Sequence, residues 1–294
     1  MNQQYKKIWN SLIVLLIVMI TSCSSDEPSN VVSIDCDFHY PSALTTSASV
    51  YGDYKTILLQ NCEIYDDIND LTWLYNVLLP IDFSPTKQYP VLYLLHGRTY
   101  DHNSWIKSLS LRKVSELYNK LGLLDIIIVM PYADKTYYLN DYQDEIKYET
   151  FFFDIFIPFI ENEYPVIKDA ESRYIGGFSM GGYGACYYML THPGKFSFCF
   201  AASCPMDGRN IEKTPPVIDY IKNTEKDKIP TFIFEVGKDD SFADCNVEFH
   251  SQLNEMSINH EFIMREGEHD NKFWKNSIYV LFDRLAYEIN SRKN

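Results

Sequence analysis

The chain has 294 residues, a formal net charge of −14, and 46% hydrophobic residues. A chain of this size fits one large domain with a substantial buried core. Its negative charge argues against binding to nucleic-acid phosphates, so no nucleic-acid partner is expected. The acidity by itself indicates nothing about a substrate.

Residues 1–22 have the order of an export signal. Lys6 and Lys7 give a basic start, residues 12–20 form an apolar run, and small residues precede Cys23. The run is short for a transmembrane span, and Ser, Asp and Pro follow it closely. We therefore predict a signal peptide over residues 1–22, with a retained anchor helix as the alternative.

The residues around Cys23 predict how the domain is held after export. Ile-Thr-Ser-Cys at 20–23 resembles a bacterial lipobox, with isoleucine where leucine is usual. The resemblance implies acylation of the Cys23 thiol, which would tether a soluble domain to a membrane. Ser-Ser-Asp-Glu at 24–27 resembles an acidic surface-export tag, with a plain solvated linker as the alternative. We expect an exported outer-membrane lipoprotein, periplasmic or surface-exposed, whose only membrane contact is the lipid on Cys23.

The rest of the chain predicts a tether and irregular entry over residues 23–49, and then one domain over residues 50–294. Segments 56–59 and 72–79 predict an antiparallel edge. Further apolar segments predict strands buried on both faces of a parallel sheet, at 91–95, 126–130, 173–177, 198–202, 231–236 and 260–264. Helical patterns lie at 111–121, 150–164, 181–191, 247–256 and 272–289, and Pro158 is expected to bend or interrupt the second. This alternation implies an α/β fold with a mostly parallel central sheet and helices on both faces.

Ser179 is the predicted nucleophile. It lies in Gly-Phe-Ser-Met-Gly at 177–181, between an apolar strand and a helix that opens with small residues. A serine on a sharp strand-to-helix turn needs small neighbours because the backbone is crowded there. The turn exposes the hydroxyl at the carboxyl edge of the sheet, where the helix N-terminus favours negative charge. The alternative is a glycine-rich turn with an idle serine.

His269 is the predicted general base. A serine hydroxyl needs such a base, and in sites of this kind the chain order is serine, acid, histidine. His269 follows the last strand, in a loop that can reach back over the serine. His192 comes too early for that order, and His250 and His260 fall in a helix and a strand, so structural roles are expected for them.

The acid that orients His269 is expected after the strand at 231–236. Asp239 and Asp240 are adjacent there, and Asp244 follows. Only one carboxylate can hold the imidazole, where it would fix the tautomer and stabilise the imidazolium.

An acyl-transfer site also needs backbone donors for the oxyanion. The Met180 N–H follows the nucleophile directly. The loop after the strand at 91–95 would supply the second donor, since Gly97 permits a tight turn, and we predict the Arg98 N–H. His96 in the same loop is expected to be packed and hydrogen-bonded. No metal or organic cofactor is required.

These residues together resemble the esterase D-related branch of the α/β-hydrolases. That branch includes tributyrin esterases, S-formylglutathione hydrolases, and feruloyl and acetyl-xylan esterases. The matching runs are Tyr-Pro-Val-Leu-Tyr-Leu-Leu-His-Gly at 89–97, His-Asn-Ser-Trp at 102–105, the nucleophile run at 176–185, His-Pro-Gly-Lys-Phe at 192–196, Gly-Lys-Asp-Asp at 237–240, and Gly-Glu-His-Asp at 267–270 with Trp274. The resemblance covers about residues 71–294, implies the α/β-hydrolase fold, and favours Asp240 as the acid. Arg98 departs from the apolar residue or glycine that usually follows His-Gly.

The resemblance implies a serine carboxylesterase that works through an acyl-enzyme. The substrate would be a small-molecule or polysaccharide ester, and export suits removal of acyl or feruloyl groups from plant polysaccharide. One alternative is an acyltransferase of the mycolyltransferase-like kind, and another is a non-catalytic glycan-binding lipoprotein. The aromatic run at 132–142 is expected to be either a substrate-facing wall or ordinary loop packing, and Trp105 either a pocket border or a buried anchor.

Cysteine usage leaves the covalent framework open. Besides Cys23 the chain has six cysteines, and an exported protein could pair some of them. The sequence does not choose among the possible pairings. It also does not predict the oligomeric state.

Overall fold

The fold was analysed in a computed structural model that describes residues 31–33, 48–51, 54–142, 145–209, 211 and 216–292. The predicted signal peptide at 1–22, Cys23 and most of the predicted tether lie outside the described residues. The chain divides into two compact units, Met1–Val31 and Val32–Asn294. In the described part of the chain, no helix combines the length and the apolar character that crossing a membrane requires.

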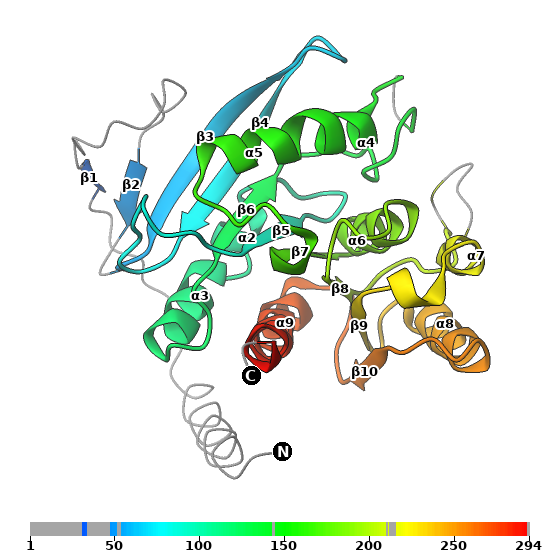
Figure 1. Cartoon of the computed structure of the whole chain (residues 1–294). Helices are drawn as coiled ribbons and strands as arrows, with labels where there is room; N and C mark the ends of the chain where they lie inside the picture. Colours follow the sequence, from blue (N-terminus) through cyan, green and yellow to red (C-terminus); the bar gives the residue numbers. More distant parts are fainter. Residues whose placement is uncertain are drawn as a thin grey trace. The chain divides into compact units, whose positions relative to one another are not determined.

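Ten strands of the described residues form one sheet in the order β1-β2-β3-β4-β6-β5-β7-β8-β9-β10 (Figure 1). Their bounds are β1 Val31–Ser33, β2 Ala48–Tyr51, β3 Ile57–Asp66, β4 Leu71–Leu79, β5 Val91–Leu95, β6 Ile127–Pro131, β7 Arg173–Phe178, β8 Phe198–Ala202, β9 Thr231–Gly237 and β10 Glu261–Arg265. Strands β5 to β10 pair in parallel, whereas β2, β3, β4 and β6 pair antiparallel in that order. This arrangement is the α/β-hydrolase fold, and the predicted fold class is confirmed.

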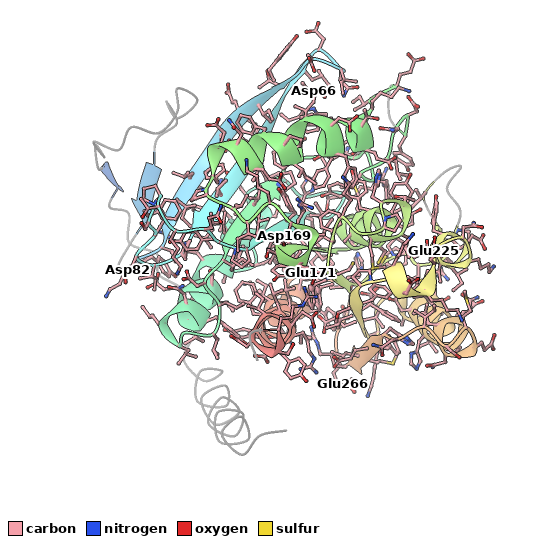
Figure 2. All side chains as sticks on the ribbon, in the orientation of Figure 1. Asp66, Asp82, Asp169, Glu171, Glu225 and Glu266 are labelled. Carbon is pink, nitrogen blue, oxygen red and sulfur yellow. The ribbon has the colours of Figure 1, made fainter. Side chains whose placement is uncertain are left out.

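Helices cover both faces of the sheet (Figure 1). In β5, Val91, Tyr93 and Leu95 belong to one buried cluster, and Leu92 and Leu94 belong to another. The first cluster lies under α4 Tyr148–Phe151, α5 Ile157–Glu163, α6 Met180–Thr191, α7 Val217–Lys222 and α8 Ala243–Glu255. The second lies under α2 Ser104–Lys107, α3 Leu111–Lys120 and α9 Asn271–Ser291. Side chains fill the space between sheet and helices on both faces (Figure 2). A strand covered twice must be apolar throughout, which is why the central segments were recognisable in the sequence.

The predicted antiparallel pair is present as β3 and β4, but it does not form the edge of the sheet. Strands β1 and β2 continue the sheet beyond β3, in the segment predicted to be irregular. They have only three and four residues, so their sequences show no period that could predict them. At the other end of the pair, Asp66 lies at the turn between β3 and β4 (Figure 2). Its buried carboxylate accepts hydrogen bonds from the N–H groups of Ile68 and Asn69 and from the Trp73 indole. These bonds close the turn between β3 and β4.

The helix predicted over residues 150–164 is interrupted, as expected from Pro158. A π-helical turn, η1 Phe152–Phe156, separates α4 from α5, and Pro158 lies in the first turn of α5. Proline has no N–H to donate to the preceding turn, so the regular α-helical bonding cannot continue through it.

No disulfide joins the cysteines that the structure describes. Cys62, Cys186, Cys199, Cys204 and Cys245 are all buried. The possible disulfides are therefore not formed among these five residues, which pack instead as small apolar side chains.

Candidate active site

Ser179 lies on a strained turn between β7 and α6. Its φ of 53° and ψ of −119° are rarely adopted by a residue with a side chain. The glycines on either side permit this turn. A Cβ on Gly177 would lie 2.3 Å from the Gly181 carbonyl carbon, and a Cβ on Gly181 would lie 2.2 Å from the Leu95 oxygen. The start of α6 therefore lies directly against the end of β5, beside the loop that follows β5.

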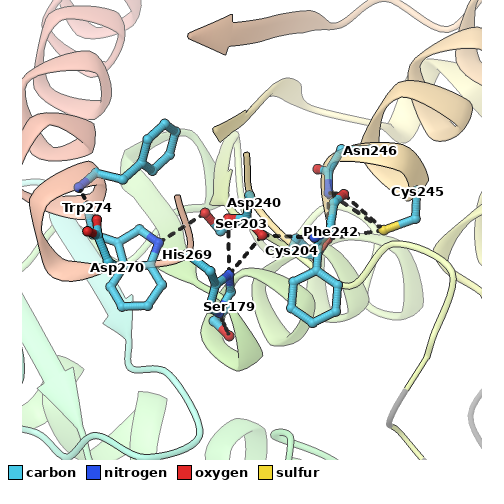
Figure 3. A network of polar contacts seen from close by, with 11 residues as sticks. Ser179, Ser203, Cys204, Asp240, Phe242, Cys245, Asn246, His269, Asp270 and Trp274 are labelled. Carbon is cyan, nitrogen blue, oxygen red and sulfur yellow. Dashed lines mark hydrogen bonds and ion pairs between the residues drawn. The ribbon is translucent and has the colours of Figure 1, made fainter. Parts of the chain in front are cut away.

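The three side chains predicted to work together are within hydrogen-bonding distance (Figure 3). The His269 Nε2 is 3.0 Å from the Ser179 Oγ. The His269 Nδ1 is 3.0 Å from both carboxylate oxygens of Asp240. These residues follow β7, β9 and β10, whose carboxyl ends lie at the same edge of the sheet because the strands are parallel.

The other two acids considered for this position do not contact His269. The Asp239 N–H donates to the Gly267 oxygen at 3.0 Å, which links the loops after β9 and β10. Asp244 forms an ion pair with Arg209. Gly237 allows these two loops to approach, since a Cβ there would lie 2.2 Å from the Gly267 oxygen.

Asp240 remains a carboxylate although its side chain is fully buried. Burial alone would raise its pKa, but hydrogen bonds from His269, from the Phe242 N–H and from the Ser203 hydroxyl lower it below its usual value. Ser203 in turn accepts a hydrogen bond of 3.0 Å from the Trp274 indole (Figure 3). A chain of donors thus runs from Trp274 through Ser203 to the carboxylate that holds the imidazole.

Two aromatic side chains fix the plane of the His269 ring. Its centroid lies 5.1 Å from that of Phe242 and 4.9 Å from that of Trp274, both in edge-to-face geometry. Phe242 and Ser203 were not predicted from the sequence. Ser203 directly follows β8, at the edge of the sheet where the other site residues lie, and its position after a predicted strand could have identified it.

The loop after β5 is held by hydrogen bonds from the segment after β6. The His96 Nδ1–H donates to the Gly97 oxygen at 2.8 Å, and its Nε2 accepts the Ala133 N–H at 3.0 Å. Burial lowers the pKa of His96 to about 4, so the ring is neutral as these bonds require. The Tyr138 hydroxyl donates to the His96 oxygen at 3.0 Å. His96 is therefore packed and hydrogen-bonded, as predicted.

Met180 and Arg98, whose N–H groups are the predicted oxyanion donors, lie at the start of α6 and in the loop after β5. Met180 is the first residue of α6, and the N–H groups of a first helical turn have no acceptor within the helix. Arg98 lies in a turn closed by the Tyr100 N–H and the Gly97 oxygen at 3.0 Å. Within the described residues no backbone hydrogen bond uses the Arg98 N–H.

The three other histidines weighed as candidate bases contact one another or an acid. The His250 Nδ1 and His260 Nε2 are 2.7 Å apart. The His192 Nε2 is 2.8 Å from a Glu149 oxygen. None of the three contacts Ser179, which agrees with the structural roles expected for them.

Some residues of the aromatic run at 132–142 are buried in the domain, and one borders a surface cleft. Tyr137 and Tyr138 are buried, and Tyr138 fits a notch that exists because residue 184 is glycine. Tyr132 is half-buried and borders a cleft of about 400 Å³ with side chains from the segment after β5, namely Thr99, Tyr100, Asp101, Asn103, Ser104, Lys107 and Ser108. Trp105 is buried, with its ring 5.0 Å from that of Phe178, so it anchors this segment beside the turn that carries Ser179.

Comparisons with known proteins agree with this geometry. A family model described as "Putative esterase" matches residues 74–283, well over half of the chain. An acetyl esterase of Caldicellulosiruptor saccharolyticus is 25% identical over 248 residues, covering 71% of this chain and 91% of that protein. An esterase of Mycobacterium tuberculosis is 33% identical over 141 residues, covering 44% of this chain and 28% of that protein. A solved structure of a ferulic acid esterase is 28% identical, with a TM-score of 0.73, and the match covers 80% of this chain and 100% of that one.

The fold and these comparisons define an α/β-hydrolase that acts on carboxylic esters. The chain belongs to the Esterase family. The prediction of an enzyme related to the esterase D branch is confirmed, and the non-catalytic glycan-binding alternative is not retained.

Proposed function

We propose that the protein is a serine carboxylesterase in which Ser179, His269 and Asp240 act as nucleophile, general base and orienting acid. The position of the imidazole carries this proposal, because one nitrogen faces the serine and the other faces a buried carboxylate. A carboxylate cannot donate, so Asp240 accepts the Nδ1–H and leaves the Nε2 lone pair directed at the Ser179 hydroxyl.

The chemical steps follow from this arrangement. Ser179 Oγ attacks the ester carbonyl while its proton passes to His269 Nε2, and Asp240 stabilises the resulting imidazolium. The Met180 and Arg98 N–H groups stabilise the oxyanion of the tetrahedral intermediate. His269 then protonates the leaving alcohol, which departs and leaves an acyl group on Ser179. A water molecule, deprotonated by His269, attacks that acyl group, and the acid is released as His269 returns the proton to the Ser179 oxygen.

The proposed substrates are small-molecule or polysaccharide esters that carry acyl or feruloyl groups. The names of the acetyl esterase relative and of the ferulic acid esterase structure support these acyl groups. Export of the chain, proposed from its first 23 residues, would give it access to extracellular polysaccharide.

Hydrolysis of 4-nitrophenyl acetate, 4-nitrophenyl butyrate and methyl ferulate tests the proposal. We expect turnover of at least one ester by the wild type and none above background by Ser179→Ala. No turnover of any of the three would contradict the esterase proposal for these acyl classes. Product analysis with a sugar acceptor present distinguishes hydrolysis from acyl transfer, because only transfer yields an acylated sugar.

The lipid anchor is a separate proposal with its own test. We expect the wild type to be recovered with the outer membrane and Cys23→Ala to be released into the soluble exported fraction. Equal membrane recovery of both proteins would contradict anchoring through Cys23.

A further inference from the structure

Arg98 differs from the other arginines of the chain in what surrounds its side chain. The side chain is exposed, and no hydrogen bond or ion pair of its guanidinium occurs within the described residues. The others each have a partner: Arg112 donates to Thr56, and Arg173, Arg209, Arg265, Arg284 and Arg292 pair with Glu161, Asp207, Glu235, Glu261 and Glu288. Among the described residues, an arginine without such a partner is thus an exception.

The backbone of Arg98 lies in a loop beside the proposed reaction centre. The loop that carries it begins at the end of β5, which lies against the start of α6 at Gly181. The proposed oxyanion donor is the N–H of Arg98 itself, so its side chain branches from a residue whose backbone would touch the ester. A side chain attached there is within reach of groups only a few bonds from the scissile bond.

Tyr137 links the loop that carries Arg98 to helix α6. Burial raises the pKa of Tyr137, and the nearby charge of Arg98 opposes that rise. The Tyr137 ring is 4.8 Å from that of Tyr142 and 6.4 Å from that of Tyr183, which lies in the first turn of α6. Tyr137 therefore lies beside the first turn of α6, and the charge of Arg98 acts on it.

Acidic side chains of the adjoining loops have other partners. Asp101 accepts hydrogen bonds from the Asn103 N–H and the Ser104 hydroxyl. Asp134 accepts a hydrogen bond from the Tyr132 hydroxyl at 3.2 Å. The chain as a whole has a net charge of −14 and would repel an anionic substrate. The positive charge of Arg98 would attract an anionic group of the substrate locally, against this repulsion.

We propose that the Arg98 side chain binds a carboxylate of the ester substrate, close to the scissile bond. The substrate class is then a carboxylate-bearing ester, either an O-acylated uronic acid, with the charge on the alcohol side, or a half-ester of a dicarboxylic acid, with the charge on the acyl side. This inference rests on the proposed function, because it requires Ser179 to be the reacting group. A guanidinium binds a carboxylate through two parallel N–H donors, which an ammonium group cannot reproduce.

The test compares anionic esters with their neutral counterparts. On the acyl side the pair is mono-4-nitrophenyl glutarate and its methyl ester, and on the alcohol side it is O-acetylated galacturonic acid and its methyl ester. The measured quantity is the ratio of kcat/KM for the anionic ester to that for the neutral ester, within each variant. A ratio cancels any general loss of activity from a change in this loop.

We expect Arg98→Gln to lower this ratio about 10- to 100-fold for one of the two pairs, which identifies the side that carries the charge. Arg98→Lys should retain part of the preference. Lys168→Gln is the control, because it also removes one positive charge from an exposed side chain. Lys168 precedes β7 and Ser179 follows β7, so the two residues lie at opposite ends of that strand. The ratio for Lys168→Gln should equal that of the wild type.

Two results would overturn the inference, and they are distinguishable. Turnover of the neutral esters with the same ratios in wild type and Arg98→Gln overturns carboxylate binding and leaves the esterase proposal intact. No turnover of any ester by the wild type overturns both.

Discussion

Helix α6 has a histidine–carboxylate pair at each end, and the two pairs differ in which group occupies the centre of the hydrogen-bonded set. At its start, the His269 imidazole lies between the Asp240 carboxylate and the Ser179 hydroxyl. At its end, the Glu149 carboxylate lies in the middle. It contacts the His192 Nε2 at 2.8 Å and accepts the Tyr187 hydroxyl at 3.0 Å.

This difference shows that connectivity, rather than composition, distinguishes the two groups. A central imidazole can take a proton from the hydroxyl while the acid stabilises the charge that forms. A central carboxylate receives both donors and has no nucleophile to activate. The Phe153 ring, stacked 3.6 Å from the His192 ring, further fixes that histidine, so this pair joins the end of α6 to α4.

The largest expected effect comes from removing the proposed nucleophile. We expect Ser179→Ala to lower kcat/KM for 4-nitrophenyl acetate by about 10⁴-fold or more, since the remaining groups cannot form an acyl-enzyme. Steady-state kinetics give the result, and circular dichroism checks folding. A folded variant whose kcat/KM falls by less than tenfold would contradict the assignment of Ser179 as the nucleophile.

The second largest effect is expected from changing the acid that orients His269. We expect Asp240→Asn to lower kcat by about 10³- to 10⁴-fold, because an amide can donate to Nδ1 and so favour the wrong tautomer. Asp239→Asn is the matched control, and it should stay within about twofold of the wild type, since the contact of Asp239 with the next loop is through its backbone. Equal losses in both variants would contradict the assignment of Asp240.

His96 extends the comparison, because both nitrogens of its ring bond to backbone groups and neither bonds to a carboxylate. Burial lowers the pKa of His96 from 6.5 to about 4, so the unfolded chain binds a proton between these pH values and the folded protein does not. The contribution of His96 to the free energy of unfolding is present above pH 6.5 and is lost as the pH falls toward 4. Urea unfolding should show a loss on the order of 3 kcal/mol in wild type that is missing in His96→Asn. Parallel pH dependences in the two proteins would contradict a buried neutral ring.

The smallest effect is expected at the second pair. We expect His192→Asn to leave kcat/KM within about twofold, because the ring does not contact Ser179. It should lower the free energy of unfolding by about 1 kcal/mol through the lost Glu149 contact and Phe153 stacking. Assays and urea unfolding measure both quantities. A tenfold loss of activity would mean that the two ends of α6 are coupled in function.

The central sheet and the three predicted side chains could be read from the sequence for physical reasons. Segments such as 91–95 are apolar throughout because helices cover both faces of the strand. Ser179 lies between glycines because its turn leaves no room for other residues, and a parallel sheet places the ends of β7, β9 and β10 at one edge.

Other features depend on contacts that no local pattern encodes. The role of Ser203 depends on Trp274 and Asp240, which approach it only in the folded chain. Strands β1 and β2 are too short to show a period. The burial of Tyr138 depends on a glycine 46 positions later, at 184, and the pattern of the aromatic run alone did not decide between wall and packing.

Covalent labelling with a fluorophosphonate tests the central claim most directly. The imidazole-centred arrangement predicts one adduct by intact mass, located by peptide mapping on Ser179, absent in Ser179→Ala and unaffected by His192→Asn. A protein that hydrolyses esters but carries no adduct, or carries it on another residue, would contradict the account.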